Sequence, residues 1–236
     1  YEKSRSLYET MSQDLNYNVM FSPRGVIMLA QTQHEVRGYQ RTAHANALQG
    51  VKTKFIRPEQ VKELVPIIDI NGSRYPVLGG LWQARGGTAR HDAVAWGYAR
   101  ACSAMGMDII QQCEVTAVRR QGSMVVGVDT NRGAIDCEKL GMVVAGHSGH
   151  LADMAGFRLP LESVSLQALV SEPIKPCMDV VVMANTVHGS MSQSDKGEMV
   201  IGGGTDGYNN FTPRGSFHHI EETVRALIET FPMISR

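Results

Sequence analysis

The sequence predicts a mixed α/β chain with a large, mostly antiparallel sheet and flanking helices. Several segments repeat apolar residues at three- and four-residue intervals, which is typical of amphipathic helices. Between them lie many short alternating or continuous apolar runs bounded by turn residues, which is typical of strands. The chain has 236 residues, 43% of them hydrophobic. That length suffices for a substantial core in one large domain or two small ones.

The first 83 residues are predicted to alternate between helices and short strands. Thr32 and Glu35 have the spacing of a capping box at the start of a helix that stops at Gly50. Pro58 suits the first turn of another helix. We expect helices at residues 1–15, 32–49 and 57–65, and strands at 18–21, 25–29, 51–56 and 75–83. The first two strands are predicted to form a hairpin around the Ser-Pro-Arg turn between them.

A loop and a helix at residues 83–106 are central to the functional interpretation. The pair Gly86-Gly87 lets the backbone turn tightly or approach a ligand closely. Asp92 is expected to cap a helix over 92–105, and Gly106 to end it. The loop therefore leads to the positive end of a helix dipole, where unpaired N–H groups favour an anion such as phosphate.

Charged and titratable side chains surround this helix start. Arg85 and Arg90 add positive charge, and His91 stands at the helix entrance. A histidine in this position is compatible with a structural role or a chemical one. The residues alone leave both open.

The second half of the chain is predicted to be rich in strands. The apolar run 140–145 suggests a buried strand, and an amphipathic helix is expected at 217–231. A short helix is predicted at 148–155. Further strands are expected at residues 108–112, 114–120, 124–130, 133–136, 162–172, 180–184, 188–192 and 198–201.

Composition argues against several classes of function. Lys plus Arg equals Asp plus Glu at 23 each, so no net field favours nucleic acid or an anionic membrane. The four cysteines are widely spaced, which argues against a zinc site or a disulfide framework and suits a reducing cytoplasmic compartment. No apolar run reaches membrane-spanning length. Because the first residue is Tyr1, we interpret the sequence as a piece of a longer protein.

Three local patterns imitate functional motifs. Residues 202–207 match the letters of a dinucleotide fingerprint, but loop residues follow them instead of the helix that the motif needs. The pair His147 and His150, and the cluster His218, His219, Glu221 and Glu222, lack the spacing of a metal enzyme. We interpret the first as a strand-to-loop turn and the others as solvated polar residues. Ser148 does not lie in a nucleophile elbow, which argues against a hydrolase.

Four stretches resemble the β subunits of heterotetrameric sarcosine oxidases, within the D-amino-acid-oxidase-like flavoprotein superfamily. The resemblance covers nearly the whole chain and is most specific in the second stretch. The stretches are Leu15–Ser22, Arg85–Arg100, Ala145–Ser148 and Ser192–Gly197.

The resemblance implies an oxidoreductase subunit. Such enzymes oxidatively demethylate sarcosine, a small secondary amine, to glycine, and the one-carbon unit leaves as formaldehyde or goes to tetrahydrofolate. Electrons pass from noncovalent FAD to covalent FMN and then to oxygen, which gives hydrogen peroxide. The FMN-tethering histidine corresponds to His91, with Arg90 beside it in the cofactor site. Implied partners are an α-type subunit and smaller subunits of the heterotetramer, and no metal is implied.

The resemblance also implies where FAD binds and how the domains divide. Backbone groups near Val115 are expected to meet the adenine, and the turn at Ala145-Gly146 to pass close to FAD. A plain edge strand and turn fit these residues equally well. A discontinuous substrate and interface domain is expected at 1–90 and 157–216. A partial FAD-binding domain with the FMN-tethering helix is expected at 91–156 and 217–236.

The chain departs from the family pattern at both ends. The glycine fingerprint of the FAD domain would precede Tyr1, and groups around the substrate would follow Arg236, so the catalytic residues are not assigned. We therefore expect this chain alone to be inactive, to bind FAD weakly or not at all, and to tend to self-associate. Two other hypotheses stay open: a single-flavin amine or amino-acid oxidase that uses FAD only, and a non-catalytic assembly scaffold.

Overall fold

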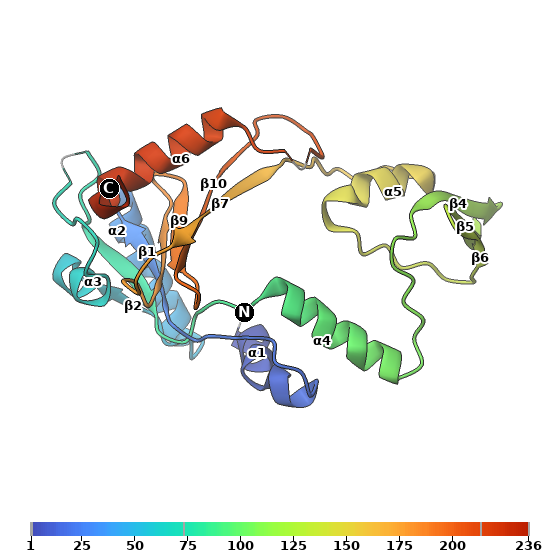
Figure 1. Ribbon diagram of the computed structural model, residues 1–236, viewed down its shortest axis with the longest axis horizontal. Coiled ribbons are helices and arrows are strands. Elements are labelled where there is room, and N and C mark those ends of the chain that lie inside the picture. The colour runs from blue at the N-terminus through green and yellow to red at the C-terminus, as the bar shows by residue number, and fades with distance from the viewer. Residues whose placement is uncertain (1, 73, 213, 236) are drawn as a thin grey trace. The chain divides into compact units, whose positions relative to one another are not determined.

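A computed structural model describes residues 2–72, 74–212 and 214–235. The chain divides into two compact units. Unit 1 comprises residues 1–104, 166–204 and 215–236, and unit 2 comprises 105–165 and 205–214. Within unit 1, Figure 1 shows a large sheet with the helix α6 lying along it. The functional domains inferred from the family resemblance have different boundaries, and that assignment stays a prediction.

Unit 1 is built on a seven-stranded sheet, which confirms the predicted fold class. Its strand order is β2-β3-β1-β8-β9-β10-β7. β1 and β8 run parallel, with Val26 opposite Val181, whereas the pairs β1–β3, β2–β3, β8–β9 and β9–β10 are antiparallel. The strands are β1 (Val26–Ala30), β2 (Lys54–Ile56), β3 (Gly79–Gln83), β7 (Leu166–Pro173), β8 (Val181–Ala184), β9 (Gly189–Gln193) and β10 (Glu198–Thr205).

The helices of unit 1 largely match their predicted positions. Thr32 caps α2 with Glu35 in the capping box that the sequence indicated, Pro58 opens α3, and the Ser216 side chain caps α6. The helices are α1 (Glu2–Asp14), α2 (Gln33–Leu48), α3 (Pro58–Leu64), α4 (His91–Ala104) and α6 (Phe217–Thr230), followed by the 3₁₀ turn η2 (Pro232–Ser235).

The core of unit 1 lies between one face of the sheet and the helices α3 and α6. Ile27 and Leu29 of β1 are fully buried there, together with Val61 of α3 and Leu227 of α6. The alternation along β1 follows from the two-residue period of a strand, which sends every second side chain into the core. Hydrophobic burial on this face therefore fixes the register of the central strands.

Unit 2 contains a three-stranded antiparallel sheet and a short helix. The sheet has the order β4-β5-β6, with β4 (Val115–Gln121), β5 (Met124–Thr130) and β6 (Gly133–Asp136). A 3₁₀ turn, η1 (Ala145–His147), leads directly into α5 (Ser148–Met154). The stacked rings of His147 and Phe211, 5.0 Å between centroids, bring the 205–214 loop against this turn.

Three predicted strands are absent from the described residues. Residues 18–21 follow an irregular path, with φ of +54° at Met20, so the first hairpin was wrong. Residues 108–112 form no strand. The run 140–145 was predicted to be a buried strand, but Val143 is 94% exposed and none of the described strands pairs with the run. Apolar residues alone do not make a strand, because a neighbouring strand must take up its backbone hydrogen bonds.

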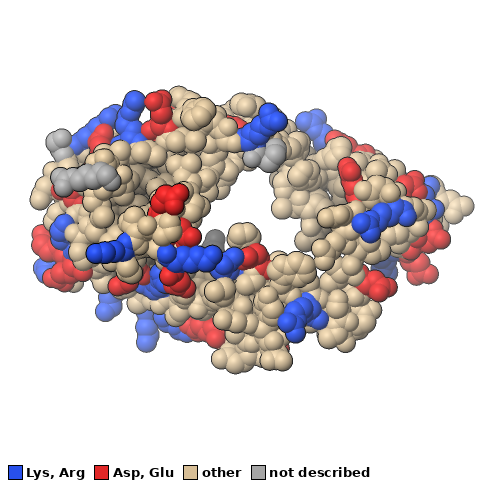
Figure 2. Space-filling model, viewed as in Figure 1, with Lys and Arg blue, Asp and Glu red and all other residues tan. Residues whose placement is uncertain are grey.

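Acidic and basic side chains are mixed on the visible face of the molecule (Figure 2). Figure 2 shows acidic and basic residues interspersed over the face in view, as the equal numbers of the two kinds suggest. Among the helices that the structure describes, none combines the length and the apolar character that crossing a lipid bilayer demands.

Candidate functional site

The loop between β3 and α4 is pinned to residues 22–25 by main-chain hydrogen bonds. Ser22 and Thr88 exchange two of them, at 2.8 and 3.0 Å, and the Gly25 N–H donates to the Gly86 carbonyl at 2.7 Å. These bonds depend on backbone groups alone. They fix the path of the loop up to Thr88, three residues before His91.

The close contact between this loop and residues 22–25 requires that residue 87 has no side chain. A Cβ atom at Gly87 would lie 2.0 Å from the Ser22 carbonyl oxygen and 2.8 Å from the Cα of Pro23. Both obstacles are backbone atoms, so they cannot turn aside as a flexible side chain would. The glycine pair that the sequence singled out therefore serves the close approach of two chain segments.

We expect Gly87→Ala to separate the loop from residues 22–25 and to lower the free energy of unfolding by about 2 kcal/mol, the usual cost of overpacking. Chemical denaturation followed by circular dichroism measures the loss. Gly141→Ala is the comparison, because a Cβ added at Gly141 would have no atom within 4 Å and the residue has no positive φ. An unchanged stability of Gly87→Ala would contradict the tight contact.

Arg85 connects the same loop to α1. Its guanidinium donates to both carboxylate oxygens of Glu9, at 3.1 and 2.5 Å, and lies 3.5 Å from Glu2. Arg5 pairs with the same two carboxylates. The hydrogen bond from Arg85 is the main reason why the pKa of Glu9 lies below its ordinary value. We call these four residues, Glu2, Arg5, Glu9 and Arg85, the α1 cluster.

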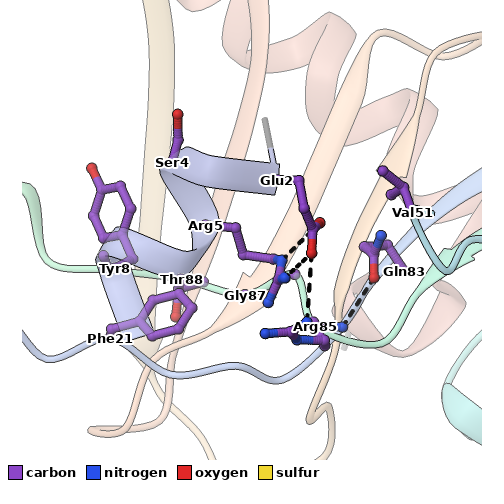
Figure 3. Close-up of a pocket in the computed structure, with 12 residues that line it drawn as sticks. Glu2, Ser4, Arg5, Tyr8, Phe21, Val51, Gln83, Arg85, Gly87 and Thr88 are labelled. Atoms are coloured by element: carbon purple, nitrogen blue, oxygen red, sulfur yellow. Dashed lines mark hydrogen bonds and ion pairs between the residues drawn. The ribbon is translucent and has the colours of Figure 1, made fainter. Parts of the chain in front are cut away.

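A pocket of about 350 Å³ lies between α1 and the loop. Figure 3 shows Arg5 and Arg85 converging on Glu2, with Tyr8 and Phe21 nearby. The rings of Tyr8 and Phe21 lie 5.9 Å apart between centroids. The lining residues are Glu2, Ser4, Arg5, Tyr8, Phe21, Val51, Gln83, Arg85, Gly86, Gly87, Thr88 and Ala89. The pocket thus combines an aromatic wall, a backbone wall and three charged side chains, those of Glu2, Arg5 and Arg85.

His91 is the first residue of α4 and its side chain is exposed. Within the described chain its imidazole makes no hydrogen bond. The neighbouring carboxylate of Asp92 instead accepts two hydrogen bonds from Arg90, at 3.1 and 2.6 Å, and one from the backbone N–H of Ala93. The Arg90 guanidinium holds the pKa of Asp92 below its ordinary value. An accessible imidazole with no hydrogen-bond partner fits a residue that forms a bond to a ligand.

The structure corrects the predicted helix start. Asp92 was expected to be the N-cap, but it lies inside the first turn of α4, and the Arg90 carbonyl accepts the Val94 N–H at 3.0 Å. The negative charge of Asp92 still lies near the positive end of the helix dipole. Its carboxylate also neutralises Arg90, so this arginine is already paired and does not present a free positive charge.

Three of the four stretches that carry the family resemblance meet around this loop. Gly97 of α4 allows close packing, because an added Cβ would lie 3.1 Å from Leu15 and 3.2 Å from Tyr17. Arg24, which follows the first stretch, donates to the Gln193 carbonyl at 2.8 Å and forms an ion pair with Asp195 in the Ser192–Gly197 stretch. The site is therefore a junction of segments that are distant in sequence.

Gln193 is a residue of this junction that sequence reasoning assigned no role. Its side chain is buried, with a residue exposure of 5%. The Oε1 atom accepts from the N–H groups of Cys177 and Met178, at 2.8 and 3.2 Å, and the Nε2 atom donates to the Lys175 and Gly197 carbonyls. A glutamine in a strand looks like any half-exposed polar residue, so no sequence signal reveals this set of bonds.

The predicted FAD contacts lie in unit 2, whereas Arg90 and His91 lie in unit 1. Val115 begins β4 opposite Thr130. Ala145 has a φ of +46°, and a Cβ added at Gly146 would meet nothing closer than Ser163 Oγ at 3.9 Å. Space beside Gly146 fits the close approach of a ligand to the backbone. The assignment of Val115, Ala145 and Gly146 to FAD stays a prediction.

Two of the imitation motifs have plain structural explanations. The glycines at 202–204 lie in β10, and loop residues follow that strand, as predicted. His218 and His219 lie within 3.3 and 3.6 Å of Glu222 on the first turns of α6. Among the residues that the structure describes, no three histidine, cysteine or acidic side chains gather as metal ligands would.

Comparison with known proteins establishes the family. The model of the family described as FAD dependent oxidoreductase matches residues 1–236, so this chain belongs to that family. It is 73% identical over 236 residues to sarcosine oxidase subunit beta of Rhodobacter capsulatus, with coverage of all of this chain and 57% of that protein. It is 49% identical over 237 residues to the subunit of the same name from Arthrobacter sp, of which it covers 58%.

A solved structure supports the fold. The L-proline dehydrogenase from P. horikoshii superposes with a TM-score of 0.90 at 22% identity, over 99% of this chain and 62% of that one. At this identity the likeness concerns the fold alone. The chain spans somewhat more than half the length of the curated relatives that it matches.

Proposed function

We propose that this chain is part of a multi-subunit flavin-dependent amine oxidase that demethylates sarcosine, with FMN attached covalently to His91. The observation that carries the proposal is the exposed imidazole of His91 at the end of a loop pinned by main-chain bonds and the α1 cluster. The naming of the relatives as sarcosine oxidase subunits supports the substrate. FAD, bound noncovalently, would take the electrons first.

The proposed reaction is a two-electron oxidation of an amine by dioxygen. The N-methyl unit of sarcosine loses two electrons and two hydrogens to give an imine, and water splits the imine into glycine and formaldehyde, or the one-carbon unit passes to tetrahydrofolate. The electrons would reach dioxygen by way of FAD and FMN, and dioxygen would become hydrogen peroxide. The flavins supply this redox chemistry when bound. The protein's part is to hold and orient them, and His91 would fix one flavin in place.

Attachment of FMN would require a neutral imidazole. One ring nitrogen of His91 would bond to the 8α-carbon of FMN, with one proton leaving that carbon and one leaving the imidazole N–H. The two electrons released in this step would be taken up by dioxygen. Noncovalent FAD contacts are assigned to Val115, Ala145 and Gly146, and the α-type and smaller subunits would complete the enzyme. The proposed compartment is the cytoplasm, a location that the free cysteines suit.

Intact-mass spectrometry of the denatured full-length protein, produced with its α-type partner and a flavin supply, tests the proposal. We expect one FMN adduct, mapped to His91 by peptide fragmentation. A bare chain that nevertheless oxidises amines with FAD would favour a single-flavin oxidase. A bare, inactive protein that still assembles with the partner would favour a scaffold. We also expect the 236-residue chain alone to be inactive and to retain FAD weakly, which flavin release and sarcosine turnover assays check.

A further inference from the structure

The α1 cluster gives the His91 loop a side-chain attachment in addition to its main-chain bonds. Two carboxylates and two guanidinium groups balance in charge, and each carboxylate contacts both arginines. Arg5 is largely covered, with 12% of its side chain exposed. The two-pronged contact between Arg85 and Glu9 fixes an orientation as well as a distance, because both groups are planar forks.

The attachment point is close to His91 along the chain. Main-chain bonds hold Gly86 and Thr88 on the side of residues 22–25, and Arg85 holds the loop against α1. Only Ala89 and Arg90 separate Thr88 from His91. The three residue steps from Thr88 to His91 span at most about 10 Å of extended chain. The position of the loop therefore restricts the position of the His91 imidazole.

We propose that Arg85 is a positioning residue for His91, which acts by holding the loop against Glu9 and Glu2 of α1. The inference rests on the proposed attachment of FMN to His91. Bond formation needs the reacting atoms about 3–3.5 Å apart and aligned, so a loosened loop would spend less time in a reactive arrangement. Arg85 itself need not touch the flavin.

A positioning residue affects the rate of FMN attachment, whereas a stabilising residue affects the unfolding temperature. Arg85 is half exposed and Glu9 partly exposed, and ion pairs at such sites contribute little to global stability. Removing the pair should therefore slow the attachment of FMN while the unfolding temperature and the affinity for FMN stay nearly the same. A residue needed only for folding would lower the unfolding temperature as well.

The experiment follows adduct formation over time in the full-length protein, assembled with its partner subunits in flavin-free form and then given FMN at several concentrations. Intact mass gives the maximal rate and the FMN concentration for half-maximal rate. The variants are Arg85→Ala, Arg85→Lys, Glu9→Gln and the double variant Arg85→Ala with Glu9→Gln. Arg74→Ala is the matched control. Arg74 forms an exposed ion pair with Glu229, with 3.4 Å between the two charged groups, and neither residue belongs to the loop.

We expect Arg85→Ala to lower the maximal rate about ten-fold, with Arg85→Lys and Glu9→Gln less affected. The double variant should be no slower than Arg85→Ala, since both changes remove the same contact. Arg74→Ala should react like the unmodified protein. The proposal is overturned if Arg85→Ala reacts at the wild-type rate, or if its loss of rate comes with an equal loss in Arg74→Ala or with a lowered unfolding temperature.

His91→Ala, assayed in parallel, separates this inference from the proposed function. An adduct that persists in His91→Ala would show that the attachment site is elsewhere, which removes the basis of the Arg85 inference too. A bare His91→Ala protein together with a normal rate in Arg85→Ala would leave the proposed attachment intact and refute only the positioning role.

Discussion

Replacing His91 with alanine is expected to abolish the proposed covalent attachment of FMN completely. The change deletes the imidazole at the first position of α4, which the described structure leaves exposed and without a hydrogen bond. Intact mass of the denatured protein should show the unmodified chain. Noncovalent FAD should stay bound, because the change leaves the contacts proposed for it, Val115, Ala145 and Gly146, unaltered.

Activity should fall with the adduct. Without a fixed FMN to pass electrons to dioxygen, we expect sarcosine-dependent oxygen consumption to fall about 100-fold, the scale of losing a well-placed reacting group. Reduction of FAD by sarcosine under anaerobic conditions should continue. His44→Ala is the control, since His44 is an exposed histidine on α2. Full oxygen consumption by a bare His91→Ala protein would contradict the electron path through FMN.

Gln193→Ala is expected to be the most destabilising single change among those considered. The side chain satisfies two backbone N–H groups and at least two carbonyls in a buried site. Leaving several buried polar groups unpaired should lower the free energy of unfolding by about 3–4 kcal/mol. Chemical denaturation followed by circular dichroism measures the change.

Two further variants sharpen this test. Gln193→Glu keeps the accepting oxygen but replaces the donating NH₂ group, and it should also destabilise, because it leaves carbonyls unpaired and buries a charge. Gln13→Ala replaces an exposed glutamine of α1 and should change stability by less than about 0.5 kcal/mol. Equal stabilities of Gln193→Ala and Gln13→Ala would refute the structural role of the buried amide.

Local sequence signals predicted the helices well. The Thr32–Glu35 box and Pro58 mark helix starts through interactions within a single turn, so neighbouring residues contain all the information required. Strand predictions were wrong where strand formation depends on pairing with a distant segment. Residues 18–21 and 140–145 have suitable apolar residues, but among the described strands none pairs with either.

The candidate site shows the same division. His91, Arg90 and the glycine pair could be selected from the sequence, because the family resemblance and the backbone freedom of glycine are local properties. The residues that contact this site from distant parts of the sequence could not be predicted. Arg85 and Glu9 are 76 positions apart, and Arg24 and Gln193 are 169 apart. Only the fold brings such residues together, so their pairing leaves no mark on either local sequence.

The parallel pairing of β1 with β8 has a consequence for synthesis of the chain. Val26 lies opposite Val181, so about 150 residues must be made after β1 before its partner exists. At 5–20 residues per second this takes roughly 8–30 s. During that interval β1 can pair with β3, while its other edge has no partner. We therefore expect the centre of the large sheet to close late, and the nascent chain to need protection of that edge against aggregation until β8 leaves the ribosome.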